Sequence, residues 1–542
     1  MTAHKIRLRK QAGAAGPVQW RRSADGEGGR MMAYDKVFYN GNIITMDSEL
    51  SRKTWLAVKD GKIAALGSDP DHPLDAEKLI DLKGMTVLPG LFDAHAHVMP
   101  TGFFLNSADL TGVSSIGEVL DILGKECLGG GDGWVFGGGF MLQNVKEERF
   151  PDKYELDSIS HGRPVMVVAQ TLHGVALNTR AMELVDIPEV AGLQRNDSGE
   201  LNGVLLADDA AFPVMGQVFA QLPEDRLFGF VRDCGEFAAS KGVTTIIGLL
   251  GQFVDGDIDV DLVLRRGDEL PVNIEVFYQT WDLEKAKAYG LPRIGGCLTL
   301  DGSGFEYTMA LNEPYPQRPE RRGFLLHTDE EIYELVSAAH KEGIQCAFHA
   351  LGTRAIDQML YIYKQVIGEQ GPKDLRHRVE HFSLPEDKHM DMLAELGLIA
   401  SMQPSFTGMW GQPEGGYYEL LFGRERADRM EVFPEILKRG GIICGGSDSP
   451  VSLIDPLYGI ACCIRNPDPR RNVSVTDAIK IFTTNAAYSV KLEDRKGSIA
   501  VGMDADLTVI DRDPYDYADS DEIYKMKAMM TVNGGKTVYD IS

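Results

Sequence analysis

The chain lacks any apolar run long enough to span a bilayer. Its 542 residues are 44% hydrophobic and 25% charged, which are ordinary values for a globular protein. Positive charge is also scarce, because 55 lysine and arginine residues face 80 aspartate and glutamate residues and leave a net charge of -25. A surface of that sign repels phosphate backbones and anionic lipids. We therefore expect no nucleic acid and no membrane as a partner, and a small-molecule substrate instead.

Cysteine is equally sparse, and its spacing contains no Cys-x-x-Cys pair. The chain has seven cysteines, an odd number, scattered over its length. This pattern indicates free thiols in a reducing compartment, so we expect a cytoplasmic protein. Residues 1–31 include several basic residues but no apolar segment of the kind that a secretory signal needs. We predict that they form a disordered extension.

Both ends of the remaining chain favour β-structure. The pairs Asn40-Gly41 and Asp60-Gly61 each separate two β-rich runs, and the segment 530–539 repeats this hairpin pattern. Short hairpins bury too little apolar surface to fold alone. We therefore predict that residues 32–87 and 491–542 pack together as one small composite β-sandwich.

Between the two ends, β-rich runs alternate with helical patterns, as in a parallel sheet. The clearest helices span 329–342 and 475–490, with Thr328 and Ser474 placed as their N-caps. A closed (β/α)8 TIM barrel over 88–490, with an insertion at about 98–230, fits this rhythm better than an open sheet. The expected β-rich runs, besides the one that ends at residue 97, are 164–169, 243–249, 272–278, 344–349, 378–382, 398–403 and 442–447.

The most informative run ends in His95 and His97. In an extended strand alternate side chains share a face, so the two imidazoles point the same way and can hold one divalent cation. An isolated His-x-His pair is a weak signal, however, because such pairs also occur on surfaces that bind nothing. Further ligands must come from elsewhere in the chain.

Three later runs also end in residues that bind metals. His349, His381 and Asp448 each close one of them, at the edge where a barrel builds its active site. Taken singly, each histidine has a structural alternative as a hydrogen-bonded core residue, and Asp448 as a helix cap. Together with His95 and His97 they form a candidate ligand set with a base.

Five short motifs follow one another along the middle of the chain: Gly-Leu-Phe-Asp-Ala-His-Ala-His at 90–97, His-Ala-Leu-Gly at 349–352, Arg-Val-Glu-His at 378–381, Ser-Met-Gln-Pro at 401–404 and Gly-Ser-Asp at 446–448. In this order they resemble the amidohydrolase 3 branch of the metal-dependent amidohydrolase superfamily, over about residues 36–540. The resemblance implies a (β/α)8 barrel, a composite sandwich, and hydrolysis of an amide, formamide or cyclic amide C–N bond by metal-activated water.

The same resemblance implies roles for individual residues. His95 and His97 would bind a first divalent metal, His349 and His381 a second, and Asp448 would bind metal and move protons. Zinc is the default ion, at one or two per chain.

Two positions depart from the pattern of that family. Many relatives place a carboxylated lysine between two metals, whereas Cys297 stands at the corresponding position here. A thiolate is a good zinc ligand, so Cys297 is a candidate bridging ligand, with a merely buried thiol as the alternative. The aspartate that usually follows the motif at 349–352 is replaced by Thr353, which offers no carboxylate.

Further residues are candidates for contact with substrate. His173 matches a His-x-x-x-x-Asn pattern in the inserted region of similar proteins, where it polarises a carbonyl or holds an oxyanion; a structural hydrogen bond is the alternative. Arg465 is a candidate for binding an anionic group, or for a surface ion pair. Four aromatic residues are candidates for an apolar pocket wall, or for core packing: Phe406, Trp410, Tyr417 and Tyr418.

Two other functions stay open on the sequence. The same barrel supports metal-dependent lyase chemistry, such as decarboxylation or hydration. A non-catalytic amidohydrolase-like protein would also carry these motifs, and Cys297 and Thr353 make that alternative more credible. The substrate is not identified, because specificity lies in loops and in the insertion. A homodimer is the expected assembly.

Overall fold

The computed structural model describes residues 33–542, apart from 69–71, 131–132, 191–192 and 207. The predicted disordered extension at 1–31 lies outside the described residues. Eight parallel strands form the central sheet, in the order β21-β20-β19-β18-β17-β16-β15-β8. These strands are β8 (Leu91–Ala96), β15 (Val243–Leu250), β16 (Asn273–Tyr278), β17 (Arg293–Thr299), β18 (Gln345–Ala350), β19 (Arg378–His381), β20 (Ile399–Met402) and β21 (Ile442–Gly445).

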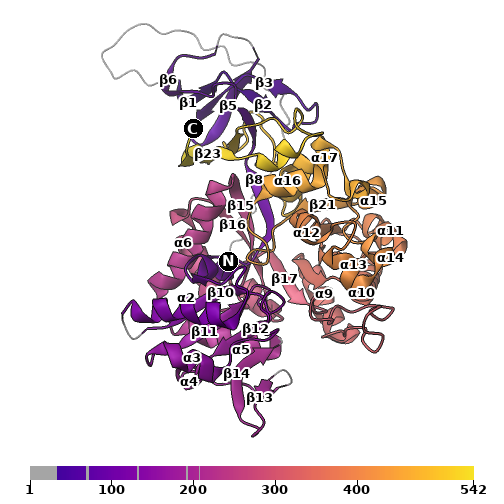
Figure 1. The fold of residues 1–542 in the computed structure, drawn as a ribbon. Coiled ribbons are helices and arrows are strands. Elements are labelled where there is room, and N and C mark those ends of the chain that lie inside the picture. Colours follow the sequence, from indigo (N-terminus) through magenta and orange to yellow (C-terminus); the bar gives the residue numbers. More distant parts are fainter. Residues whose placement is uncertain (1–32, 69–71, 131–132, 191–192, 207) are drawn as a thin grey trace, which may run out of the picture.

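The two edges of this sheet meet beyond the end of β21. The backbone N–H of Asp448 donates to the carbonyl oxygen of His95 at 2.8 Å, and the N–H of His97 donates to that of Ser449 at 2.9 Å. These bonds close the sheet, and the predicted (β/α)8 TIM barrel is confirmed (Figure 1). Apolar side chains such as Phe92, Ile247 and Phe277 pack the interior.

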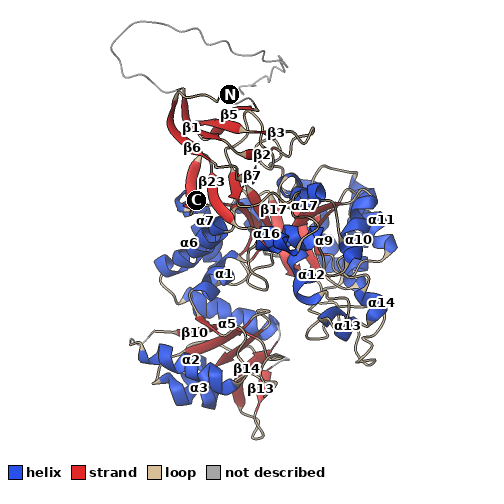
Figure 2. Ribbon diagram, turned by 45° about the horizontal axis from the view of Figure 1, so that its top comes forward, coloured by secondary structure: helices blue, strands red, loops and turns tan. Residues whose placement is uncertain are grey.

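Helices follow the barrel strands, and α9, α10 and α11 lie on its outer side in Figure 2. The helices outside the insertion are α1 (Val98–Leu105), α6 (Glu224–Ser240), α7 (Ile258–Arg266), α8 (Leu283–Ala288), α9 (Asp329–Glu342), α10 (Thr353–Gln370), α11 (Asp387–Glu395), α12 (Pro404–Trp410), α13 (Tyr417–Phe422), α14 (Arg424–Ala427), α15 (Phe433–Lys438), α16 (Pro456–Ile464), α17 (Val475–Ile481) and α18 (Thr484–Ser489).

The two predicted helices have different outcomes. The helix at 329–342 is α9, and Thr328 caps it by accepting a hydrogen bond from the N–H of Glu331. The predicted helix at 475–490 is wrong as one element, because it breaks at Phe482 into α17 and α18. The break frees the carbonyl oxygen of Phe482, which accepts a hydrogen bond from the N–H of Phe92 on β8 at 2.9 Å. A contact with the barrel thus replaces one turn of helix.

The insertion forms its own six-stranded sheet, in the order β13-β14-β12-β11-β10-β9, at the lower end of both views (Figures 1 and 2). The predicted run 164–169 lies here as β11, so its assignment to the barrel is wrong. The elements of this region are β9 (Ala108–Asp109), α2 (Ile116–Leu128), β10 (Val135–Phe140), α3 (Lys153–Ser160), β11 (Val165–Ala169), β12 (Gly174–Leu177), α4 (Thr179–Met182), β13 (Leu193–Arg195), β14 (Leu201–Leu206) and α5 (Asp208–Ala220).

The place of that run in the barrel is taken by β17, which no β-rich pattern indicates. Gly295 and Gly296 interrupt β17 with φ angles of +89° and +94°, a region that only glycine adopts readily. A Cβ atom at position 295 would lie 2.0 Å from the carbonyl oxygen of Ala347. The close approach of β18 therefore requires glycine here, and the same glycines hide the strand in the sequence.

Two further sheets lie above the barrel in Figure 1, in the orders β5-β4-β1-β6 and β24-β23-β22-β7-β2-β3. The C-terminal strand β22 pairs with the N-terminal strand β7, and one buried cluster joins Phe38 and Leu56 to Leu507 and Val532. The domain boundaries at 32–87, 88–490 and 491–542 stay a prediction. The strands are β1 (Tyr34–Tyr39), β2 (Asn42–Ile44), β3 (Arg52–Lys53), β4 (Trp55–Lys59), β5 (Lys62–Gly67), β6 (Ala76–Asp81), β7 (Thr86–Pro89), β22 (Leu507–Ile510), β23 (Ala528–Asn533) and β24 (Lys536–Asp540).

Two of the predicted hairpins form. The pair Asp60-Gly61 joins β4 to β5, and the segment 530–539 joins β23 to β24. The hairpin at Asn40-Gly41 is wrong, because β1 pairs with β4 and β6 whereas β2 pairs with β3 and β7. The turn at Asn40-Gly41 connects β1 in one sheet to β2 in the other, and each strand pairs with strands other than its neighbour in sequence.

All seven cysteines lie within the described residues, where they are buried and form no disulfide. Among the described helices, none combines the length and the apolar character needed to cross a bilayer.

Candidate metal centre

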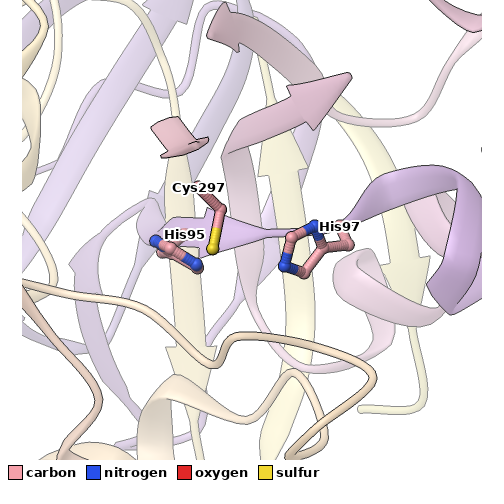
Figure 3. Close-up of side chains that lie close together, drawn as sticks. All are labelled: His95, His97 and Cys297. Atoms are coloured by element: carbon pink, nitrogen blue, oxygen red, sulfur yellow. The ribbon is translucent and has the colours of Figure 1, made fainter. Parts of the chain in front are cut away.

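Strand β8 presents the two histidines of the His-x-His pair at the open end of the barrel. The side chains of His95, His97 and Cys297 point toward a common space (Figure 3), and their ligand atoms lie within 4.8 Å of one another. All three residues are buried. A nitrogen, nitrogen and sulfur donor set of this kind suits zinc and its first-row neighbours.

A second group shares His95 and adds His381 and Asp448, again with ligand atoms within 4.8 Å of one another. His381 and Asp448 have positive φ angles of 67° and 58°, which non-glycine residues rarely adopt. Backbone strain of this kind concentrates at functional sites, where the fold over-determines the conformation. The Oε1 atom of Gln403 accepts a hydrogen bond from Nδ1 of His381 at 2.8 Å, which leaves Nε2 of His381 for a ligand.

His349 lies beside these groups, with its ring centroid 4.6 Å from that of His381. Its Nδ1 atom lies 3.2 Å from Oδ1 of Asp301 without a hydrogen bond, and the Asp301 carboxylate accepts from the backbone N–H groups of Leu351 and Gly352. Thr353 instead accepts the N–H of Asn312 at 2.8 Å. Asp301 therefore fixes the backbone that follows β18 and places a carboxylate beside His349, which Thr353 does not.

The arrangement of polar atoms favours a cation between them. Nδ1 of His95 is 2.6 Å from Oε2 of Glu380, so this nitrogen carries the proton of the neutral ring. Nε2 of His95 and Nε2 of His97 then face Oδ1 of Asp448 at 3.1 and 3.2 Å. His95 Nε2 and Asp448 Oδ1 are buried without a hydrogen-bond partner. Lone pairs at this distance repel unless a proton or a metal ion lies between them, so the residues fit a cation.

The electrostatics support the same reading of the site. Burial lowers the pKa of His95, but the neighbouring Asp448, Cys297 and Glu380 outweigh it and raise this pKa well above its usual value. Burial raises the pKa of Asp448, yet the adjacent imidazoles of His95 and His97 hold that pKa well below its usual range. Burial raises the pKa of Cys297 to about 11, with the neighbouring His95 acting in the opposite direction. A metal must therefore displace the thiol proton in order to bind Cys297.

The site contains two further residues, Arg378 and Glu380, to which the sequence patterns assigned no role. Both are fully buried, and Arg378 donates to both carboxylate oxygens of Glu380 at 2.7 Å. Burial raises the pKa of Glu380, but the charge of Arg378 and the hydrogen bond to His95 lower it to about 2. The sequence did contain a signal for this pair: Arg378 and Glu380 are two positions apart on a barrel strand, so both side chains face the barrel interior.

A pocket with an empty volume of about 930 Å³ opens at the candidate metal centre. Five of the candidate ligands contribute to its lining: His97, Cys297, His349, His381 and Asp448. It is otherwise largely apolar. The remaining predicted substrate contacts that line it are His173, Phe406, Trp410 and Tyr418.

Two predicted contacts lie elsewhere. The Tyr417 side chain, in a residue 38% exposed, packs on Phe305 with ring centroids 5.6 Å apart and does not line the pocket. Arg465 forms an ion pair with Asp521, which is the surface alternative for this residue. Arg465 does not line the pocket, so the structure favours the ion pair over contact with an anionic substrate group.

The (β/α)8 barrel thus brings four histidines, a cysteine and an aspartate together as a candidate centre for a divalent metal. The comparison with protein families agrees: the model of the amidohydrolase family matches residues 78–539. The chain belongs to this family, and the predicted resemblance is confirmed.

Known relatives match nearly the whole chain. Protein LONG AFTER FAR-RED 3 of Arabidopsis thaliana is 27% identical, over 93% of this chain and 91% of its own length. The N-substituted formamide deformylase of Arthrobacter pascens is 25% identical, over 93% and 98%. A crystal structure of an uncharacterized metal-dependent hydrolase from Pyrococcus furiosus covers 88% of this chain and 99% of its own, at 25% identity and a TM-score of 0.72.

Proposed function

We propose that the protein hydrolyses a C–N bond other than a peptide bond, in an amide, formamide or cyclic amide of a small molecule, with a divalent metal, zinc by default. The observation that carries the proposal is the convergence of His95, His97, His381 and Asp448 at one end of a largely apolar pocket. Two relatives support it, since one is named for deformylating N-substituted formamides and one for metal-dependent hydrolysis.

A bound divalent cation supplies Lewis acidity and lowers the pKa of water toward about 7. The protein supplies the proton transfers. Asp448 is ionised and contacts both His95 and His97, so its carboxylate can take the proton of the attacking water and return it to the leaving nitrogen. His173 lines the same pocket and, in this proposal, donates a hydrogen bond to the carbonyl oxygen as negative charge develops there.

The first prediction concerns Asp448 and the metal. Asp448→Asn keeps the shape of the side chain but removes the proton acceptor, so kcat should fall about 100- to 10,000-fold. Removal of metal by a chelator should abolish turnover, and restoring the metal should recover it. Elemental analysis, together with rates on N-substituted formamides, N-acyl amines and cyclic amides, provides the measurement.

Asp455→Asn is the matched control, because Asp455 caps α16 and pairs with Lys241, and asparagine preserves the cap. Its rate should stay unchanged. Undiminished activity of the metal-free protein, or of Asp448→Asn, would remove the proposed chemistry. Release of carbon dioxide or addition of water without C–N cleavage would indicate a lyase, and a metal content well below one per chain would indicate a non-catalytic protein.

A further inference from the structure

A second chamber adjoins the pocket of the candidate metal centre. Its empty volume is about 1330 Å³, and it lies between the sheet of the insertion and the loop that follows β17. Phe140, Phe150 and Leu206 line it from the insertion, and Phe324 and Leu326 line it from the loop. The insertion therefore covers part of the barrel mouth, and the second chamber beside it is open to solvent on one side, where Phe324 is 50% exposed.

The two spaces meet at one short segment. Thr171 and His173 line both the pocket and the second chamber. The loop after β17 contributes to both as well, since Ser303 faces the pocket and Glu306 faces the second chamber. The Ser303 hydroxyl donates to the Glu306 carboxylate across this boundary. Thr171 and His173 are therefore a wall that the two spaces share, and a substrate group extending beyond them would lie in the second chamber.

The second chamber has a definite chemical character. Seven of its sixteen lining residues are phenylalanine, leucine or methionine, and most of the surface they expose is apolar, as in sites that bind apolar groups. The described residues of the wall include the carboxylates of Asp209 and Glu306 but no lysine or arginine. Apolar surface attracts alkyl and aryl groups, whereas the two carboxylates repel a group that ends in an anion.

We propose that the second chamber binds an uncharged alkyl or aryl acyl group of the substrate, while the pocket beside the metal centre holds the amine portion. This inference rests on the proposed function, in which His173 faces the carbonyl oxygen. The leaving nitrogen must face Asp448, which lines the pocket but not the second chamber, so the acyl substituent is the group left to face His173 and the second chamber. The substrate class is an N-substituted amide with a long apolar acyl group, which is larger than a formyl group.

Binding of methyl ketones tests the second chamber without any hydrolysis, because a ketone has no C–N bond. The metal-loaded protein is titrated with 2-hexanone, 2-nonanone and 2-undecanone by calorimetry. Affinity should rise about fourfold for each added methylene buried. Leu142→Trp places an indole ring in the chamber and should weaken 2-undecanone binding at least tenfold, while 2-hexanone binding stays the same.

Leu128→Trp is the matched control, because Leu128 is 71% exposed on α2 and lines neither space. Phe324→Glu, at a residue that is 50% exposed, adds an anion to the chamber with little risk to folding and should also weaken the long ketone. Equal ketone affinities for every chain length, or equal long-chain binding in all variants, would overturn the inference. Chain-length dependence that Leu142→Trp removes, without hydrolysis of any amide, would support the subsite and refute the proposed function.

Discussion

At the scale of single residues, the candidate metal centre depends on a buried ion pair that binds no substrate. Arg378 also donates to the carbonyl oxygen of Ala94 and to the hydroxyl of Ser401, so its guanidinium is fixed at the barrel axis. Glu380, held by that guanidinium, accepts the proton of His95 Nδ1. Carboxylates in this position fix the ring orientation of a metal-binding histidine. Glu380 is therefore a positioning residue.

Glu380→Gln keeps the size of this side chain but removes its charge. Arg378 would be left as an unpaired buried cation, which costs about 3–5 kcal/mol of stability, and metal affinity should fall about 10- to 100-fold. Urea unfolding of the metal-free protein and a competitive metal titration measure the two effects. Glu493→Gln is the control, because its pair with Arg376 is 37% exposed on the Glu493 side and should cost about 1 kcal/mol or less. An unchanged metal affinity in Glu380→Gln would exclude the positioning role.

The sequence predicted the residues that end strands, and not those that support them. His95, His97, His381 and Asp448 each follow a visible β-rich run, so the barrel topology alone brings them together. Glu380 contacts His95 across 285 positions of the chain. No local pattern specifies such a pair, because it depends on which strands become neighbours.

At the scale of elements, the strand β17 carries Cys297 into the site only because two glycines precede it. Both take positive φ angles, and β18 approaches the first of them closely. The same property made β17 the one barrel strand that the β-rich pattern missed, whereas regular strands such as β15 and β18 were predicted. Local propensity thus fails where tertiary packing demands a special backbone conformation.

Gly295→Ala tests this dependence. The added Cβ would collide with the carbonyl oxygen of Ala347, so the free energy of unfolding should fall by about 3 kcal/mol or more, with loss of metal as Cys297 shifts. Gly290→Ala, at φ +68° with nothing within 4 Å, carries only the backbone strain and should cost about 1 kcal/mol. Urea unfolding and metal content separate the two variants. Equal stability losses would show that the approach of β18 imposes no constraint.

At the scale of the whole molecule, resistance to acid depends on a buried histidine pair remote from the metal centre. His340 Nε2 donates to the Gly371 carbonyl oxygen, so its Nδ1 accepts from Nε2 of His377 at 3.0 Å. His377 Nδ1 accepts from the N–H of Cys346. Each ring therefore holds one proton and has no position for a second. Burial, aided by His340, lowers the pKa of His377 from 6.5 to about 3, and burial also lowers that of His340, with Lys373 acting in the same direction.

Because the folded pKa of His377 lies below the unfolded one, the unfolded chain binds more protons between pH 6.5 and pH 3. Stability should therefore fall as the pH drops through this window, by up to about 1.4 kcal/mol per pH unit from this one group. His377→Asn should make the dependence shallower by that amount, as measured by urea unfolding from pH 6.5 to 4.5. His161→Asn, at an exposed site, should leave the slope unchanged. Parallel slopes for the natural protein and His377→Asn would refute this assignment.

The closed barrel was predictable at this scale from the alternation of strands and helices. The partners of the terminal strands were not, since β1 and β2 enter different sheets although the turn between them favours a hairpin. Turn chemistry describes one local option, and burial against distant strands decides the pairing.

The first and last barrel strands are joined by an isolated bridge between Ala96 and Ser449, with Asp448 bonded to His95 alongside it. His95 and Asp448, which would bind the ion, therefore lie on the two sides of the contact that closes the barrel. By thermodynamic linkage, ion binding stabilises the contact between β8 and the segment after β21, and that contact increases the affinity for the ion by the same free energy. Ion loss and loosening of the barrel wall are then coupled steps of one equilibrium.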